Sequence, residues 1–216
     1  MNNLKLLIAT NNKGKVEEIQ DLLKDIGVKL VTPNDMDIKL HVEEDGSTYA
    51  ENAEKKALAF AHASSLISLA DDSGLEVDAL NGAPGLFSNR YSPPLSLPQN
   101  SKNLGGDGGG RTDADRRAYL LKNLKDKPRP WTAAFHATIA IATPGNSSVR
   151  FAEGECKGEI IPEERGTGGF GYDPIFFIPE TNRTMAELSM EEKNRLSHRA
   201  RAIINAKQIL KDVFGL

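Results

Sequence analysis

The chain has 216 residues, nearly balanced acidic and basic side chains that leave a formal net charge of -3, and one cysteine, Cys156. This length suits one large domain or two closely joined lobes. The charge balance gives no support for binding long nucleic acids, which usually demands a basic face, and one cysteine excludes an intramolecular disulfide. Because the first residues lack a signal-peptide pattern and no apolar run would span a bilayer, we expect a cytoplasmic protein without a membrane partner.

The N-terminal part of the chain predicts a strand, a helix and a second strand. Residues 4–9 are an apolar run typical of a short buried strand. Residues 15–26 place their apolar side chains on one face of a helix, which we expect Gly27 to end. Residues 28–31 follow as a second strand, so this β-α-β unit predicts a parallel pair joined by a right-handed crossover.

The turn between the first strand and the first helix, with the sequence TNNKGK, looks like a phosphate-binding loop but lacks its key residues. A loop of the GxxxxGK[ST] kind needs a glycine where this chain has Ala9, and a serine or threonine where it has Val16. The turn is therefore not a phosphate loop of the usual kind, and its residues alone leave open what it binds.

Residues 48–70 predict a capped helix followed by a strand. Thr48 and Glu51 have the spacing of a capping box, in which each side chain accepts a hydrogen bond from the backbone amide of the other residue. Residues 49–64 continue as an alanine-rich helix, and residues 66–70 form a brief apolar strand. That strand runs directly into acidic residues, where we expect it to end.

Two groups of carboxylates flank this helix. Asp71 and Asp72 follow the strand, at the carboxyl end where open α/β sheets place their ligands. If the strand continued through them, their side chains would point to opposite faces and only one could reach a ligand directly. Glu43, Glu44 and Asp45 form the second group. One acid from each group would suffice for Mg²⁺, which also takes substrate phosphates as ligands; helix capping and turn formation are the alternative.

The middle of the chain changes in character. Residues 92–111 are rich in Pro, Gly and polar residues and predict a mobile surface loop. Residues 113–124 look helical. Residues 132–143 and 149–157 are rich in β-formers and flank a turn, which predicts an antiparallel hairpin. A β-rich lobe is thus expected after an α/β lobe.

A helical tail is predicted from about Met185, with an interruption near Ser197. Its apolar stripe favours a core or dimer contact over a catalytic role, and consists of Ala202, Ile203, Ala206, Ile209, Leu210 and Val213. His198 has no second histidine at HxxxH spacing and no Ser-His-Asp pattern, so zinc chemistry is disfavoured.

The segment GTGGFG, residues 166–171, fits the letters of a dinucleotide-binding GxGxxG motif. Its context does not fit, because such a motif opens a helix, whereas residues 172–177 predict a strand that begins near Pro174. The glycines instead allow close backbone approach to a ligand, with Phe170 or Tyr172 offering an aromatic face for stacking on a base. A tight structural turn with a core aromatic is the alternative.

Taken together and in this order, these segments resemble the inosine triphosphate pyrophosphatase family, which clears aberrant purine triphosphates from the nucleotide pool. The TNNKGK turn fits that family's [ST]xNxxK signature. The segments AENAEKKA, ADDSGLEVDALNGAPGLFSNRYS, GTGGFGYDPIFF and MAELSMEEKNRLSHRA resemble its other blocks and extend the likeness over nearly the whole chain. Each motif alone is weak, but five in the same order leave chance a poor explanation.

The resemblance implies a fold and a reaction. The fold would be α/β, one domain over residues 1–216 in two lobes: an elongated mixed sheet with flanking helices and a nucleotide cleft between the lobes. Members are commonly homodimers. The reaction would be magnesium-dependent hydrolysis of purine nucleoside triphosphates (ITP, dITP or XTP) between the α and β phosphates, giving a nucleoside monophosphate and pyrophosphate.

The resemblance also implies the site residues. Asp72 would be the catalytic carboxylate, binding Mg²⁺ together with Glu44 and helping to deprotonate the attacking water, while Lys56 would neutralise phosphate charge. The other substrate-binding residues would be Thr10, Asn11, Asn12, Lys13, Gly14 and Lys15 in the turn, Ser73, then Phe170, Gly171, Tyr172 and Asp173 at the base, and Lys193, His198 and Arg199 closing around base and phosphates.

Two features depart from the family pattern. A glycine-rich insert at residues 105–110 lengthens a connection, and Asp115, Arg116 and Arg117 stand where an Asp-x-x-Asn start of the next helix is more typical. We expect altered loop mobility near the dimer contact and an intact active site. Two rival functions remain open: a catalytically silent nucleotide-binding or sensing protein, and a hydrolase of ordinary nucleotides.

Overall fold

The computed structural model describes residues 4–92 and 112–216, and the chain divides into two compact units. Unit 1 comprises Met1–Ser73, His136–Cys156 and Met190–Leu216, and unit 2 comprises Gly74–Phe135 and Lys157–Ser189. The predicted mobile loop at residues 92–111 lies outside the described residues from position 93 onward, and the glycine-rich insert lies there too. Along the described ranges, no helix is long and apolar enough to cross a membrane.

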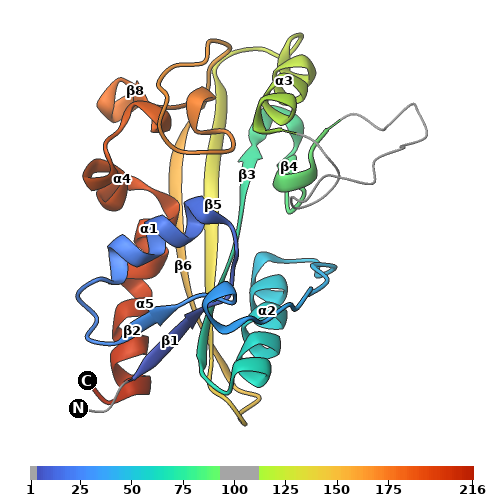
Figure 1. Cartoon of the computed structure of the whole chain (residues 1–216). Helices are drawn as coiled ribbons and strands as arrows, with labels where there is room; N and C mark the ends of the chain where they lie inside the picture. Colours follow the sequence, from blue (N-terminus) through green and yellow to red (C-terminus); the bar gives the residue numbers. More distant parts are fainter. Residues whose placement is uncertain (1–3, 93–111) are drawn as a thin grey trace. The chain divides into compact units, whose positions relative to one another are not determined.

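The fold is mixed α/β, as predicted (Figure 1). The strands are β1 (Lys5–Ile8), β2 (Lys29–Val31), β3 (Ile67–Val77), β4 (Pro84–Gly85), β5 (Trp131–Ala142), β6 (Val149–Ile160), β7 (Phe176–Ile178) and β8 (Arg183–Thr184). The α-helices are α1 (Lys13–Leu23), α2 (Tyr49–Ser64), α3 (Asp113–Leu124), α4 (Met190–Leu196) and α5 (His198–Phe214). Short 3-10 helices are η1 (Asn34–Met36), η2 (Asp78–Leu80), η3 (Ser88–Arg90), η4 (Asp173–Ile175), η5 (Pro179–Thr181) and η6 (Met185–Glu187).

The strands form one mixed sheet in the order β2-β1-β3-β5-β6-β7-β8, with β4 added to β3. β1 pairs in parallel with β2 and with β3, so that Leu6 lies opposite both Leu30 and Ile67. This confirms the parallel pair predicted for the β-α-β unit. Six residues connect β5 to its neighbour β6, too few for a parallel crossover, so this pair is the predicted antiparallel hairpin.

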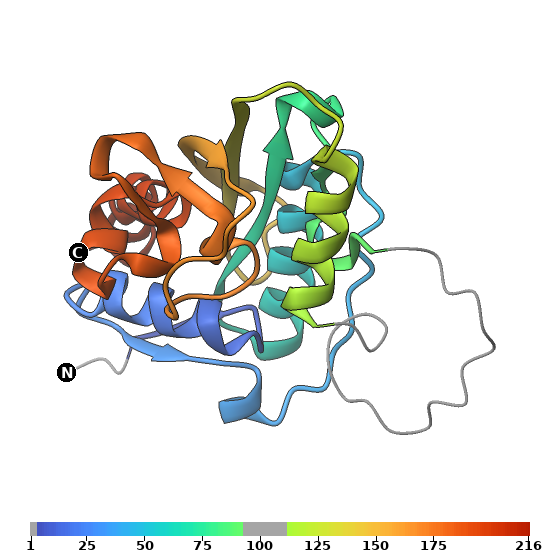
Figure 2. The ribbon, with the colours of Figure 1, turned by 90° about the horizontal axis from the view of Figure 1, so that it is seen from above.

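The core of unit 1 has two apolar clusters, one on each face of its strands. Because side chains alternate along a strand, Leu6 and Ile8 of β1 pack with α1 and α5, whereas Leu7 packs with α2. Figures 1 and 2 show α5 and α2 on opposite sides of these strands. The predicted apolar stripe of the tail is core: Ala202 and Ile203 are fully buried within the first cluster.

Unit 2 is organised around Ser88 and an aromatic pair. The Ser88 hydroxyl accepts a hydrogen bond from the Leu75 amide at 2.8 Å. The backbone carbonyl of Ser88 accepts one from the Tyr172 hydroxyl at 2.9 Å. The rings of Phe135 and Phe176 lie with centroids 4.5 Å apart. These contacts join β3, η3, β5 and β7 through segments far apart in the sequence.

Two local predictions need correction. Thr48 caps α2 by accepting from the Glu51 amide at 3.1 Å, but the Glu51 carboxylate accepts from the Ser47 amide at 2.7 Å, so the expected capping box is shifted by one residue. Residues 172–177 do not form one strand: η4 occupies Asp173–Ile175 and β7 begins at Phe176. Proline fixes φ near the helical value and has no amide to donate to a sheet, which suits Pro174 to the 3-10 turn.

Gly154 of β6 lies close against the backbone of α5. A Cβ at this position would lie 2.2 Å from the His198 carbonyl oxygen and 2.4 Å from the Ala202 amide nitrogen, both backbone atoms that cannot move aside alone. We therefore expect Gly154→Ala to lower the free energy of unfolding by about 1–3 kcal/mol or more, as overpacking does. Urea unfolding measures this, with Glu153→Ala at the adjacent exposed position as the control; equal stability of the two variants would contradict it.

Candidate active site

The turn after β1 is built by its own side chains. Asn12 is the N-cap of α1, and its side-chain oxygen accepts from the Lys15 amide at 3.1 Å. The Asn12 amide in turn donates to the Thr10 hydroxyl at 3.2 Å. α1 therefore begins at Lys13, two residues earlier than predicted, and its first turn lies at the end of a buried strand. Helix N-termini carry a partial positive charge and unpaired amides, which favour anions.

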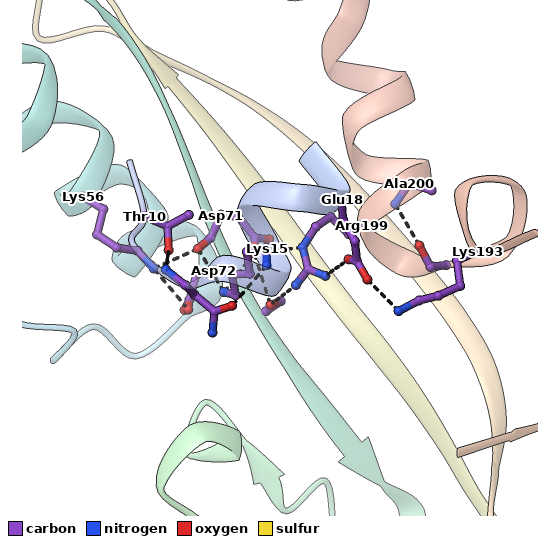
Figure 3. Close-up of polar contacts among 12 residues, drawn as sticks. Thr10, Lys15, Glu18, Lys56, Asp71, Asp72, Lys193, Arg199 and Ala200 are labelled. Carbon is purple, nitrogen blue, oxygen red and sulfur yellow. Dashed lines mark hydrogen bonds and ion pairs between the residues drawn. The ribbon is translucent and has the colours of Figure 1, made fainter. Parts of the chain in front are cut away.

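Side chains of this turn divide by burial. Lys15 is buried, whereas Asn11 and Lys13 are exposed. The Lys15 ammonium lies 2.9 Å from a carboxylate oxygen of Asp71, whose second partner is the Arg199 guanidinium at 3.2 Å. Figure 3 shows these three side chains converging from α1, β3 and α5. Lys15 is thus held in place rather than solvated.

Glu18 joins the same network, although the sequence analysis did not select it. Its two carboxylate oxygens lie 2.6 Å from the Lys193 ammonium and 2.5 Å from an Arg199 nitrogen (Figure 3). Glu18 is 5% exposed and lies one turn after Lys15, on the buried side of α1. Its position on the core-facing side of the predicted helix could have indicated an ion pair, because charged side chains are almost never fully buried unless paired.

Asp72 lies in a second group with Lys56, Glu44 and Asn52. The Lys56 ammonium is 2.8 Å from Glu44 and 3.5 Å from Asp72, and it donates to the Asp71 carbonyl at 2.9 Å. The Asn52 side-chain amide donates to Asp72 at 3.2 Å. The two carboxylates predicted to bind metal therefore border the same ammonium.

The strand predicted at residues 66–70 is longer than expected and includes Asp71 and Asp72. β3 does not end before them but continues to Val77, and Leu75 pairs with Gly85 of β4. The strand tolerates two acidic residues because each meets a cation. As alternation requires, Asp71 contacts Lys15 and Arg199, whereas Asp72 contacts the Lys56 group.

The ionisation of the site follows from burial and these pairs. Burial acts to raise the pKa of Asp71, but Arg199 and Lys15 hold it well below its usual range. Burial likewise opposes ionisation of Glu18, and Arg199 with Lys193 keeps its pKa lowered. For Asp72, burial dominates over the attraction of Lys56 and raises its pKa. Asp71 and Glu18 therefore stay ionised, whereas burial makes Asp72 easier to protonate than an ordinary aspartate.

Ser73 and His198 complete the predicted residues of unit 1. Arg199 donates to the Ser73 hydroxyl at 3.1 Å. His198 begins α5 directly after the N-cap Ser197, whose hydroxyl accepts from the Ala200 amide at 3.2 Å. Burial, with the neighbouring charge of Arg199, holds the pKa of His198 well below its usual value, so the imidazole is neutral at pH 7.

The predicted base-binding residues belong to unit 2. Phe170 is half-buried, and its amide donates to the Asp173 carboxylate at 3.1 Å. Tyr172 is 4% exposed with its hydroxyl bonded inside unit 2, so its ring is a core element. Gly171, at φ 61°, adopts a left-handed conformation that favours glycine. Phe170 is therefore the aromatic residue of this segment that remains a candidate for stacking.

The described side chains suit magnesium better than zinc. Across residues 4–92 and 112–216, no group of three or more His, Cys, Asp or Glu side chains is arranged to hold a metal. Glu44 and Asp72 nevertheless converge on one ammonium. Two carboxylates next to a cation-rich turn match magnesium, which takes one or two carboxylates plus substrate phosphates, and do not match the closed nitrogen and sulfur sites of zinc.

Comparison with known proteins gives consistent matches over nearly the whole chain. The model of the Ham1 family matches residues 6–209. A dITP/XTP pyrophosphatase of Desulforamulus reducens is 46% identical over 98% of this chain and 98% of its own, and one of Geobacter sulfurreducens is 45% identical over 98% and 96%. The solved HAM1 protein of Coxiella burnetii has a TM-score of 0.81 at 39% identity, covering 97% of this chain and 99% of its own. The chain therefore belongs to the Ham1 family.

Proposed function

We propose that this chain hydrolyses aberrant purine nucleoside triphosphates (dITP, ITP and XTP) to the nucleoside monophosphate and pyrophosphate. Its role would be to clear them from the nucleotide pool, as a homodimer in the cytoplasm. The observation that carries the proposal is the set of buried cations in unit 1, Lys15, Lys56, Lys193 and Arg199, beside a helix N-terminus and two carboxylates suited to Mg²⁺. The choice of substrate rests on similarity to proteins named dITP/XTP pyrophosphatase.

The turn after β1 would bind the triphosphate. The side chains of Thr10 and Asn12 already form hydrogen bonds that shape the turn. The main groups with which the turn could bind an anion are therefore the backbone amides at the start of α1 and the Lys15 ammonium. Lys15 is oriented by Asp71, and Lys193 by Glu18. Cations fixed in advance need little reorganisation when charge develops on phosphate, which is where electrostatic catalysis gains most.

In the proposed step, a water oxygen would bond to the α-phosphorus while the bond from that phosphorus to the bridging oxygen breaks and this oxygen leaves with pyrophosphate. Asp72 would take the proton that this water loses. Glu44 and Asp72 would hold Mg²⁺, which supplies charge stabilisation on phosphate oxygens and makes the water more acidic. Lys56, which contacts both carboxylates, would orient them and balance their charge. Such phosphoryl chemistry depends mainly on positioning and electrostatics.

Pyrophosphate release from dITP, XTP, dATP and dGTP, measured with Mg²⁺, tests this function. We expect dITP and XTP to be hydrolysed up to roughly a hundredfold faster than dATP. Adenine has an amino group where hypoxanthine and xanthine have an oxygen, so a buried donor that binds this oxygen would be left unpaired by adenine. Equal rates for all four would identify a hydrolase of ordinary nucleotides. Binding of dITP without pyrophosphate release would identify a catalytically silent nucleotide-binding protein.

Glu44→Gln is expected to raise the Mg²⁺ concentration needed for half-maximal turnover by about tenfold or more, because a neutral amide is a weaker ligand for a hard cation than a carboxylate. Chelation of divalent cations should stop turnover of the wild type, and added Mg²⁺ should restore it. Glu43→Gln is the matched control, since Glu43 is the exposed neighbour of the half-buried Glu44. An unchanged Mg²⁺ requirement in Glu44→Gln contradicts its role as a ligand.

A further inference from the structure

The glycine loop of unit 2, residues 166–171, is held in one shape by its own surroundings. The Gly168 amide donates to the Ala186 carbonyl at 3.0 Å, and the Phe170 amide donates to Asp173. A Cβ at Gly169 would lie 2.0 Å from the Asp173 carboxylate. The loop is thus bound to η6 through Ala186 and to η4 through Asp173. Gly171, next to Phe170, is held by a different element.

That other element is α3. The Asp113 carboxylate accepts from the Gly171 amide at 2.7 Å, and the Arg117 guanidinium donates to the Gly171 carbonyl at 2.8 Å. Both polar groups of one glycine are thus bound by side chains one helical turn apart. Such charge-assisted hydrogen bonds are roughly twice as strong as neutral ones.

Arg117 is itself held by a third residue. Its Nε and Nη2 donate to the two carboxylate oxygens of Glu164 at 2.8 and 2.9 Å, the bidentate geometry that a guanidinium matches. The side chain of Arg117 is 12% exposed, and its hydrogen bonds lower the pKa of Glu164. Glu164 therefore fixes the guanidinium with one nitrogen directed at Gly171.

We propose that Asp113 and Arg117 are positioning residues that hold Gly171, and with it the Phe170 ring, in the conformation that receives the purine. The proposal rests on the proposed function for its ligand, but the contacts themselves are independent of it.

Hydrogen exchange tests the contacts without any activity. In Asp113→Ala and Arg117→Ala, we expect the peptide covering residues 166–173 to exchange at least about tenfold faster, because Gly171 loses an acceptor or a donor that orders it. Asp113→Asn keeps an acceptor oxygen and should retain most of the protection. Lys122→Ala, at an exposed position of the same helix, is the control. Unchanged exchange in both alanine variants overturns the proposal.

Steady-state kinetics test the consequence. In Arg117→Ala, we expect KM for dITP to rise about tenfold with kcat within about twofold of wild type, because binding lost equally from ground and transition states changes KM alone. Inhibition by inorganic tripolyphosphate, which has no purine, should stay unchanged. A parallel rise in KM and in the inhibition constant would mean a general structural defect and overturns the proposal. A wild type that hydrolyses no dITP refutes the proposed function instead, and the exchange result still judges the contacts.

Discussion

Asp72→Asn is expected to reduce pyrophosphate release from dITP by about a hundredfold or more while the protein stays folded. The substitution removes a carboxylate that would both take the proton of the attacking water and bind Mg²⁺ with Glu44. Loss of a general base alone typically costs 10²–10⁴ in rate. Steady-state turnover at saturating dITP and Mg²⁺ measures the effect, and near-normal activity would remove Asp72 from the mechanism.

Asp71→Asn is the informative companion, since the two acids are neighbours on one strand. Burial raises the pKa of Asp72, so its ionised form gives little stability and the asparagine variant should unfold at nearly the wild-type temperature. Asp71 has a lowered pKa, so its charge stabilises the fold at pH 7, above its usual pKa. Taking that anion from Lys15 and Arg199 should lower the free energy of unfolding by about 3–5 kcal/mol. Equal stability of the two variants contradicts this assignment.

Local patterns were enough to predict most of the fold. The helices at residues 49–64 and 113–124 match α2 and α3, because caps and apolar spacing are encoded within a few residues. The first strand, the parallel pair and the hairpin followed from the same kind of signal. Alternation along a continued strand also predicted that Asp71 and Asp72 would point to opposite faces, and their side chains contact different cations.

Features that depend on distant partners could not be predicted in this way. β3 continues through two acidic residues only because Lys15, Arg199 and Lys56 come from other elements to meet them. Glu18 has partners more than 170 positions away, and nothing in its local sequence names them. The binding of Gly171 by Arg117 is equally non-local. The family resemblance selected residues by motif, so it omitted the residues that orient those motifs.

Arg199 has a predicted role in substrate binding that differs from the contacts it makes in the structure, and an experiment is needed to relate the two. The resemblance assigned it to the base and phosphates, and a guanidinium, which only donates, would suit the oxygen at position six of hypoxanthine and xanthine. In the structure, its three nitrogens donate to Asp71, Glu18 and Ser73, and the residue is 2% exposed. These three hydrogen bonds support a role of Arg199 in stabilising the fold, whereas its contact with the base stays a prediction.

Arg199→Ala is expected to lower the free energy of unfolding by about 3–5 kcal/mol, because it leaves the buried carboxylates of Asp71 and Glu18 without their shared partner. Arg199→Lys should recover only part, since an ammonium cannot span Glu18, Asp71 and Ser73 at once. Arg201→Ala, two residues along α5 and exposed, is the control. If Arg199 also donates to the six-oxo group, Arg199→Ala should lower turnover of ITP far more than that of ATP and narrow the ratio between the two rates, because alanine removes the donors. If both rates fall but the ratio of ITP to ATP turnover stays fixed, Arg199 acts only on the phosphates and on the stability of the fold. Selection of the base must then come from the glycine loop that contains Phe170.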